Sequence, residues 1–218
     1  MALFVFDLDG TLIDSRRDLA DAANALLEER GGGPLPVDVI ARMVGEGAAL
    51  LVRRALTTAG LDPESPGALP RFLELYDERL LAHTQLYDGT RETVETLAAD
   101  APLAVLTNKP ARATQEILDG LDVARFFRWV VGGDGPWPRK PNPAALQELM
   151  NRAGTAPPQT VMIGDSPIDL ATARAAGTRV CMVRYGFGFT LSEHDLGPDD
   201  LIVDRPSDLV SVLRRTSV

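Results

Sequence analysis

Cysteine, positive charge and long apolar runs are all scarce in this chain. Cys181 is the single cysteine among 218 residues, so it has no partner for an internal disulfide, which fits a reducing compartment. No apolar run approaches the ~20 residues of a membrane span, and the first predicted strand begins by Leu3, which leaves no room for a targeting segment. The sequence therefore predicts a cytoplasmic protein without a membrane partner.

Positive charge is outnumbered by negative charge. Lys and Arg total 22 residues against 31 Asp and Glu, which gives a formal net charge of −9 at pH 7. Nucleic-acid binding depends on Lys and Arg that neutralise backbone phosphates, so this composition argues against nucleic acid as the main partner. A small anionic molecule held by a few local cations is still allowed, and the sequence does not determine the oligomeric state.

Short apolar segments rich in β-branched residues recur along the chain and predict the strands of a buried sheet. From residue 103 onward they alternate with helical segments, which is the pattern of βαβ units. We therefore predict an α/β fold with a doubly wound, Rossmann-like parallel sheet. The predicted strands are residues 3–6, 103–106, 129–131, 161–163, 180–183 and 201–203.

The segment between the first and second strands has no strand pattern. It runs from about residue 15 to 86, which is too long for one crossover helix and predicts an inserted subdomain. Leu19 and Leu26 fall on one face of a helix that would begin after a cap at Asp14 or Ser15. We expect an all-helical cap domain over residues 15–86 and an α/β core domain over residues 1–14 and 87–218.

Two carboxylates, Asp7 and Asp9, follow the first apolar strand where it breaks into a turn. Like charges ~4 Å apart repel by about 4 kcal/mol at an effective dielectric constant of ~20, so a stable protein usually balances such a pair with a cation. Mg²⁺ is the expected cation, because it takes hard oxygen ligands and bridges carboxylates to phosphate groups. The alternative is that both are turn and helix-capping residues, since Asp-Gly is a common turn signal.

Polar residues also follow the second strand and precede a later helix. Thr107 and Asn108 come directly after residues 103–106. In an open parallel sheet, ligands bind outside the carboxyl ends of the strands, so Thr107 and Asn108 are predicted to face Asp7 and to hydrogen-bond a phosphate. The alternative for this pair is an ordinary polar loop before a helix.

Lys140 lies just before a helix for which Asn142 is the predicted N-cap. An ammonium at this position would balance the carboxylates and hold a transferring phosphoryl group. The alternative is a solvated loop lysine. The bond between Lys140 and Pro141 is a candidate for the cis form, because X–Pro bonds have only a small trans preference.

A further acidic group follows the predicted strand 161–163 in Gly164-Asp165-Ser166-Pro167-Ile168-Asp169. Asp165 leaves the strand end as Asp7 does, and Asp169 comes one helical turn later, so both are predicted to converge on one ion directly or through water. Each group alone is weak evidence. Four groups in the same relation to successive strands predict one metal-dependent site.

Together these residues resemble the motifs of the haloacid dehalogenase-like (HAD) hydrolase superfamily. The four motifs occur in the expected order: Asp7-Leu8-Asp9-Gly10-Thr11, Thr107-Asn108, Lys140, and Gly164-Asp165 with Asp169. Within the superfamily the chain resembles the phosphoglycolate phosphatase group, through Val44-Gly45-Glu46-Gly47-Ala48, Thr107-Asn108-Lys109-Pro110 and Gly132-Gly133-Asp134. The resemblance implies a hydrolase for a small phosphorylated metabolite, with 2-phosphoglycolate as the leading substrate.

The resemblance also implies roles in catalysis. Asp7 would attack phosphorus and form an aspartyl-phosphate. Asp9 would protonate the leaving alkoxide and then deprotonate the attacking water. The groups expected to bind the phosphoryl oxygens are Thr107, Asn108 and Lys140.

The same resemblance implies a Mg²⁺ site and a substrate loop. Mg²⁺ would be held by the Asp7 side chain, the Asp9 main-chain carbonyl and Asp165, with Asp169 supporting its water shell. The cap would close over the site and exclude water, bringing the loop of Gly45, Glu46 and Gly47 to the leaving group. Four cap arginines are either surface charges or ligands of a substrate carboxylate, namely Arg16, Arg17, Arg53 and Arg54.

Other functions stay open at this point. A dehalogenase would use the first Asp without a metal, and the presence of Asp9 argues against it. A phosphomutase would return the phosphoryl group to a sugar, so turnover with water alone would distinguish it. Other phosphatase substrates include sugar phosphates such as N-acetylmuramic acid 6-phosphate, nucleotides and pyrophosphate. A phospho-receiver module would have no large helical insertion, and a noncatalytic binding protein would not need every catalytic residue type.

Overall fold

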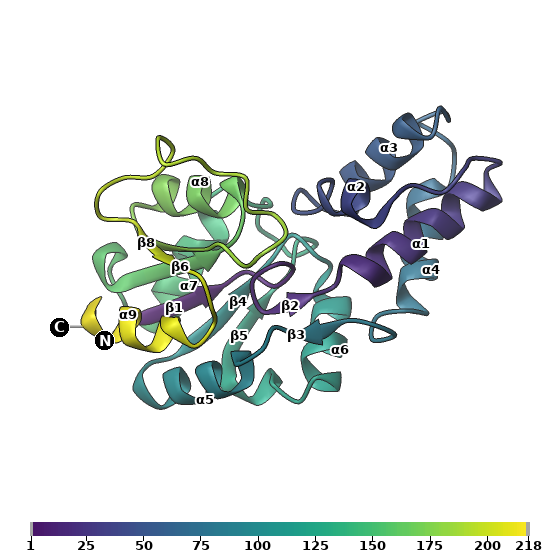
Figure 1. Ribbon diagram of the computed structural model, residues 1–218. Helices are drawn as coiled ribbons and strands as arrows, with labels where there is room; N and C mark the ends of the chain where they lie inside the picture. Colours follow the sequence, from purple (N-terminus) through teal and green to yellow (C-terminus); the bar gives the residue numbers. More distant parts are fainter. Residues whose placement is uncertain (1, 217–218) are drawn as a thin grey trace.

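A single parallel sheet forms the centre of the protein in the computed structural model, which describes residues 2–216. The strand order is β5-β4-β1-β6-β7-β8, so β1 (Leu3–Phe6) lies in the middle and the chain winds outward on both sides (Figure 1). The predicted doubly wound α/β fold is confirmed. The other strands are β4 (Leu103–Leu106), β5 (Phe127–Val131), β6 (Thr160–Gly164), β7 (Arg179–Val183) and β8 (Leu201–Val203).

Alternate residues of β1 point to opposite faces of the sheet and enter different cores. Phe4 and Phe6 join one core, while Leu3 and Val5 join the other. Strands buried on both faces show continuous apolar runs, which is why sequence located them well. Helices α7 (Ala144–Ala153) and α8 (Pro167–Ala176) cover the face of Leu3 and Val5, and α5 (Thr90–Asp100), α6 (Ala111–Gly120) and α9 (Asp208–Thr216) cover the face of Phe4 and Phe6.

Four helices form a separate unit beside the sheet, at the upper right of Figure 1. The chain enters this unit through β2 (Ile13–Asp14) and leaves it through β3 (Gln85–Leu86), which pair antiparallel. This ribbon was not predicted, because two residues per strand produce no periodic pattern. The helices are α1 (Arg16–Glu29), α2 (Val37–Ala41), α3 (Ala48–Thr58) and α4 (Ala68–Asp77).

One helix start and one helix-cap contact differ from the prediction. Helix α7 begins after Pro143, one residue later than predicted, although the Asn142 side chain still accepts a hydrogen bond from the Ala144 amide at 3.0 Å. Ser15 does occupy the N-cap of α1, but its hydroxyl donates to Oδ1 of Asp9 at 2.5 Å instead of capping the helix. A residue expected to stabilise a helix therefore contacts a predicted catalytic group.

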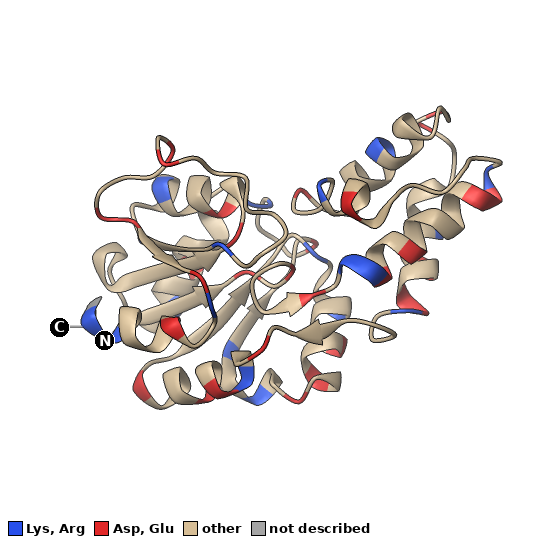
Figure 2. Ribbon diagram, in the orientation of Figure 1, with Lys and Arg blue, Asp and Glu red and all other residues tan. Residues whose placement is uncertain are grey.

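Charged residues are interspersed over both parts of the molecule (Figure 2). Several form exposed pairs one helical turn apart, such as Arg42 with Asp38 at 3.0 Å and Arg152 with Glu148 at 2.9 Å. Exposed pairs of this kind contribute about 0–1 kcal/mol each, so the apolar cores stabilise the fold. Among the described residues, no helix is both long and apolar enough to cross a bilayer.

Candidate active site

The acidic residues that lie far apart in the sequence meet at the carboxyl ends of two neighbouring strands. Asp7 follows β1 and Asp165 follows β6, and the Asp7 amide donates to the Ile163 carbonyl at 2.8 Å. Carboxylate oxygens of Asp7, Asp165 and Asp169 lie within 4.8 Å of one another, and all three residues are buried. This is the edge of the sheet where ligands bind in doubly wound folds.

Lys140 lies between two of these carboxylates. Its Nζ is 2.8 Å from Oδ1 of Asp7 and 2.6 Å from Oδ1 of Asp169, and its side chain is 2% exposed. Burial acts to lower the pKa of Lys140, but the charges of Asp169 and Asp7 raise it above its usual range, so the ammonium stays charged. The Lys140–Pro141 bond, which the sequence left open as a candidate for the cis form, is cis.

Asp169 is held rigidly at the start of α8. Its Oδ2 accepts hydrogen bonds from the hydroxyl and the amide of Ser166, at 2.6 and 3.1 Å, in a reciprocal capping box. Its Oδ1 is occupied by Lys140. Gly164 is required here, because a Cβ at that position would overlap the Asp169 carboxylate. Asp169 therefore positions Lys140 in addition to lying in the acidic cluster.

Asp165 is enclosed by a loop that sequence analysis missed. The Gly188 amide donates to its Oδ2 at 2.7 Å, and the Thr11 hydroxyl lies 3.5 Å from its Oδ1. A Cβ on Gly10, whose φ is +84°, or on Gly186 would overlap Asp165. The two glycines of Tyr185-Gly186-Phe187-Gly188 after β7 were the available signal for this close approach.

The three clustered carboxylates destabilise one another. Burial, followed by the charge of Asp169, raises the pKa of Asp7 from 3.8 to about 7, despite the nearby Lys140. Burial and the charges of Asp169 and Asp7 also raise the pKa of Asp165 well above its usual range. The cluster therefore carries more negative charge than Lys140 balances, and its all-oxygen donor set suits a hard divalent cation.

Asp9 lies outside this cluster and pairs with a second buried lysine. Nζ of Lys109 is 3.1 Å from Oδ2 of Asp9 and 2.8 Å from the hydroxyl of Tyr76 in α4. Burial acts to lower the pKa of Lys109, but Asp9 and Tyr76 raise it above its usual range. Sequence analysis assigned no role to Lys109 or Tyr76. The signal was that Lys109 and Lys140 are the only two lysines in the chain.

Thr107 and Asn108 lie at the end of β4, next to β1. The amide nitrogen of Asn108 donates to the carbonyls of Gly45, at 2.9 Å, and Lys140, at 3.0 Å, while its Oδ1 accepts from the Lys140 amide at 2.9 Å. Its side chain therefore links the helical unit to Lys140, with both amide hydrogens already donated. The Thr107 hydroxyl accepts from the Lys109 amide at 3.2 Å and keeps its own hydrogen for another acceptor.

A cavity lies between the helical unit and this edge of the sheet. Gly45 and Gly47 line it, but Glu46 does not, because its exposed carboxylate pairs with Arg54 at 2.5 Å. The polar wall comprises Asp7, Asp9, Thr107, Asn108 and Lys109, and the opposite wall includes Leu19, Val44, Ala48, Leu51, Phe72, Leu73 and Tyr76. Only the two glycines of the predicted cap loop therefore face the cavity.

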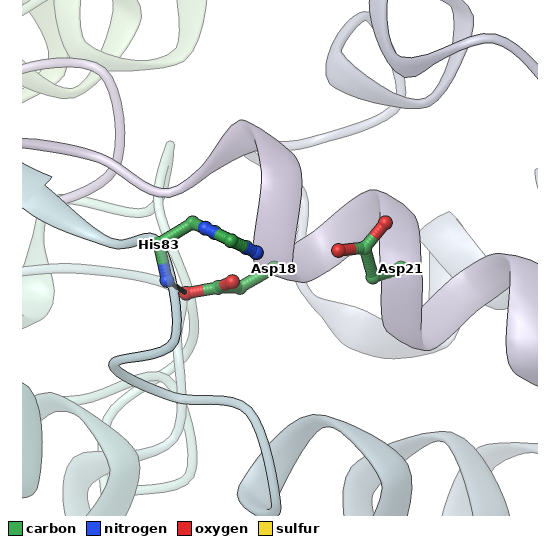
Figure 3. Close-up of side chains that lie close together, drawn as sticks. All are labelled: Asp18, Asp21 and His83. Atoms are coloured by element: carbon green, nitrogen blue, oxygen red, sulfur yellow. Dashed lines mark hydrogen bonds between the residues drawn. The ribbon is translucent and has the colours of Figure 1, made fainter.

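Asp18, Asp21 and His83 form a second cluster where the chain returns from the helical unit (Figure 3). Oδ2 of Asp18 accepts from the amides of His83, at 2.9 Å, and Thr84, at 2.7 Å, and from the Thr84 hydroxyl at 2.7 Å. Asp18 is fully buried, whereas Asp21 and His83 are exposed. Asp18 thus fastens α1 to the segment that leads back to the sheet.

Comparisons with known proteins agree with this geometry. The family model of the haloacid dehalogenase-like hydrolases matches residues 4–183. The chain is 37% identical over 214 residues to phosphoglycolate phosphatase 1 of Pseudomonas aeruginosa, covering 95% of this chain and 78% of the relative. It is 43% identical over 191 residues to the phosphoglycolate phosphatase of Rhodospirillum rubrum, covering 84% and 79%.

A solved structure extends the likeness to three dimensions. The crystal structure of a predicted phosphoglycolate phosphatase from Haemophilus somnus matches with a TM-score of 0.89 and 30% identity, covering 97% of each chain. The family resemblance found in the motifs is therefore confirmed over most of the chain. The chain belongs to the haloacid dehalogenase-like hydrolases and, within them, to the phosphoglycolate phosphatase group.

Proposed function

We propose that this protein is a Mg²⁺-dependent phosphatase that hydrolyses a small phosphate monoester through an aspartyl-phosphate on Asp7, with 2-phosphoglycolate as its substrate. The observation that carries the proposal is the convergence of Asp7, Asp165 and Lys140 at one edge of the sheet. The names of the relatives support the choice of substrate. Residues 15–86 act as the cap, and residues 1–14 and 87–218 act as the core.

Charge balance supports a divalent cation in this site. When Asp7, Asp9, Asp165 and Asp169 are ionised, the two buried lysines neutralise only two of the four charges. One divalent cation balances the remainder. Asp7 and Asp165 would be its side-chain ligands, with Asp169 nearby. When bound, Mg²⁺ would neutralise phosphoryl oxygens and hold the phosphate against Asp7.

In the first half-reaction, Asp7 attacks phosphorus through the oxygen that Lys140 does not hold. The bond from phosphorus to the ester oxygen breaks, and its electron pair leaves with that oxygen. Asp9 gives the oxygen its proton and releases an alcohol. Lys140 and the free hydroxyl hydrogen of Thr107 bind phosphoryl oxygens, while the Asn108 side chain keeps Lys140 in place.

In the second half-reaction, Asp9 is a carboxylate and takes a proton from a water molecule. The water oxygen attacks phosphorus, the bond to Asp7 breaks, and inorganic phosphate leaves. Ser15 and Lys109 hold the two oxygens of Asp9, at 2.5 and 3.1 Å, so the same carboxyl group is oriented for both proton transfers. The apolar wall of the cavity keeps other water away from the site.

The test is hydrolysis of 2-phosphoglycolate by the purified protein, with Mg²⁺ and with excess chelator. We expect turnover to require the metal, and Asp7→Asn to lower kcat by about 10³-fold or more, because it removes the nucleophile. Circular dichroism should report an unchanged fold. Substantial Mg²⁺-dependent activity in Asp7→Asn would refute the proposed intermediate. A higher kcat/KM for N-acetylmuramic acid 6-phosphate or a nucleotide would keep the phosphatase and replace the substrate.

A further inference from the structure

Lys109 is a buried cation. In the proposed hydrolysis, its only role is to hold the Asp9 carboxylate. Its side chain is 4% exposed, and Lys109 forms part of the cavity wall. Burying an ammonium costs several kcal/mol unless anions or dipoles compensate. Among the cavity-lining residues in the described part of the chain, Lys109 is the one that carries positive charge. This cation is therefore placed to contact whatever the cavity holds.

Four arginines of the helical unit lie near other acidic residues. Arg53 pairs with Glu64 at 2.7 Å, and Arg54 pairs with Glu46 at 2.5 Å. Arg16 lies 2.6 Å from Asp14, and Arg17 lies 3.9 Å from Asp21. None of these four arginines, which the sequence offered as candidates for substrate binding, lines the cavity.

The leaving group would occupy the cavity that Lys109 lines. Within 4 Å among the described residues, Lys109 has one carboxylate partner, Asp9. A carboxylate on the leaving group would be a second anionic partner for the same ammonium.

Tyr76 completes a set of donors at the same place. Its hydroxyl accepts from Lys109 at 2.8 Å, which leaves its own hydrogen to donate. Its ring lies 4.5 Å from Nζ and stacks on Phe72 at 6.0 Å between centroids, so the side chain is held in position. Burial raises the pKa of Tyr76 to about 12, so the hydroxyl keeps that hydrogen. Lys109 also has one N–H beyond those used by Asp9 and Tyr76.

We infer that Lys109 and Tyr76 form the subsite that binds a carboxylate on the leaving group and so determine the preference for a substrate that carries one. The inference rests on the proposed phosphatase function and deepens it. The subsite lies next to Asp9, which protonates the ester oxygen, so a carboxylate one carbon from that oxygen suits the geometry. Because Tyr76 belongs to α4, the subsite also forms only when the helical unit lies against the core.

The experiment compares 2-phosphoglycolate with ethyl phosphate, which differs by replacing the carboxylate with hydrogen. We expect the wild type to prefer 2-phosphoglycolate in kcat/KM by about 10- to 100-fold, the range of a charge-assisted hydrogen bond. Lys109→Met should bring this ratio close to one. Tyr76→Phe should lower this ratio by a smaller factor, and Lys109→Arg should retain part of the preference. Glycolate should inhibit ethyl phosphate hydrolysis in the wild type and lose this effect in Lys109→Met.

Controls separate a binding role from a role through Asp9. Arg53→Met removes an exposed cation from the same helical unit and should leave the ratio unchanged. If Lys109→Met lowers both substrates equally, Lys109 acts only through Asp9 and the subsite is refuted. Equal use of both substrates by the wild type refutes the subsite and leaves the phosphatase intact, whereas hydrolysis of neither refutes both the subsite and 2-phosphoglycolate as the substrate. If Lys109→Met does not fold, Tyr76→Phe and glycolate inhibition decide the question.

Discussion

The ammonium of Lys140 lies 2.8 Å from Oδ1 of Asp7 and orients the carboxylate that we propose attacks phosphorus. The contact joins a residue at the end of the central strand to one that precedes α7. Asn108 keeps the Lys140 backbone in place through two hydrogen bonds. The site is thus held by side chains from three separate parts of the chain.

Lys140→Met is expected to lower kcat/KM for 2-phosphoglycolate by about 10²–10³-fold, the usual effect of losing one group that stabilises transition-state charge. Inhibition by inorganic phosphate should weaken as well. Steady-state kinetics at saturating Mg²⁺ measure both effects. Lys140→Arg is the charge-preserving control and should recover part of the rate. Unchanged kinetics in Lys140→Met would remove this residue from the site.

Metal-free protein is expected to lose stability as the pH rises. The pKa of Asp7 is raised to about 7 in the folded state, and that of Asp165 is raised as well, so the folded state binds more protons than the unfolded state between about pH 4 and pH 7. Folding is therefore favoured less by these groups as the pH rises through that window. Mg²⁺ would occupy the deprotonated cluster, so its stabilising effect should grow with pH.

Thermal unfolding in chelator and in millimolar Mg²⁺ measures this linkage. The metal should raise Tm more at about pH 8 than at about pH 5.5, and each kcal/mol corresponds to about 2–4 °C in a chain of this size. Asp165→Asn is the matched variant, because it removes one of the two carboxyl groups whose pKa is raised. It should reduce the difference between the Tm shifts at the two pH values. An equal Mg²⁺ effect at both pH values would contradict the linkage.

Asp18→Ala is expected to destabilise the protein by about 2–4 kcal/mol, because it leaves buried donors without an acceptor. These are the amides of His83 and Thr84 and the Thr84 hydroxyl. Urea unfolding monitored by circular dichroism gives the free energy directly. His83→Ala keeps the backbone amide and should change stability by less than about 0.5 kcal/mol. A similar loss in both variants would show that the His83 side chain matters.

Asn108→Ala is expected to loosen the loop around Gly45, since it removes the hydrogen bond from Asn108 to that carbonyl at 2.9 Å. Amide hydrogen exchange over residues 44–48 should become faster. The same change frees the Lys140 backbone, so kcat/KM should fall by about tenfold, consistent with one lost hydrogen bond of ~1.4 kcal/mol. Unchanged exchange in this loop would argue against the link between cap and core.

Sequence reasoning located the strands of the large sheet because their burial on both faces leaves apolar runs with sharp ends. It did not find β2 and β3, which hold two residues each, or the helix α5, whose alternating Thr, Arg and Glu obscure a narrow apolar stripe of Val94 and Leu97. The start of α7 shifted by one residue, because Pro143 took the cap position. Local pattern therefore sufficed where an element has a continuous apolar run or a wide apolar face.

The same distinction between local and long-range signals applies to the candidate site. Each acid at a strand end was recognisable from its neighbours, since a carboxylate after a buried strand stands out locally. The roles of Lys109, Tyr76 and Asn108 were not recognisable, because each depends on a partner from another part of the chain.

The order of residues along the chain was enough to predict an α/β fold with acids at the ends of its strands, because strand burial and motif spacing are properties of neighbouring residues. The pairing of particular oxygen and nitrogen atoms was decided by the tertiary structure. The contact of Lys140 with Asp7 depends on the strand order, and the contact of Lys109 with Tyr76 depends on the packing of the four-helix unit against the sheet edge. Those pairings decide which charges are balanced, and therefore which ligand the cavity can accept.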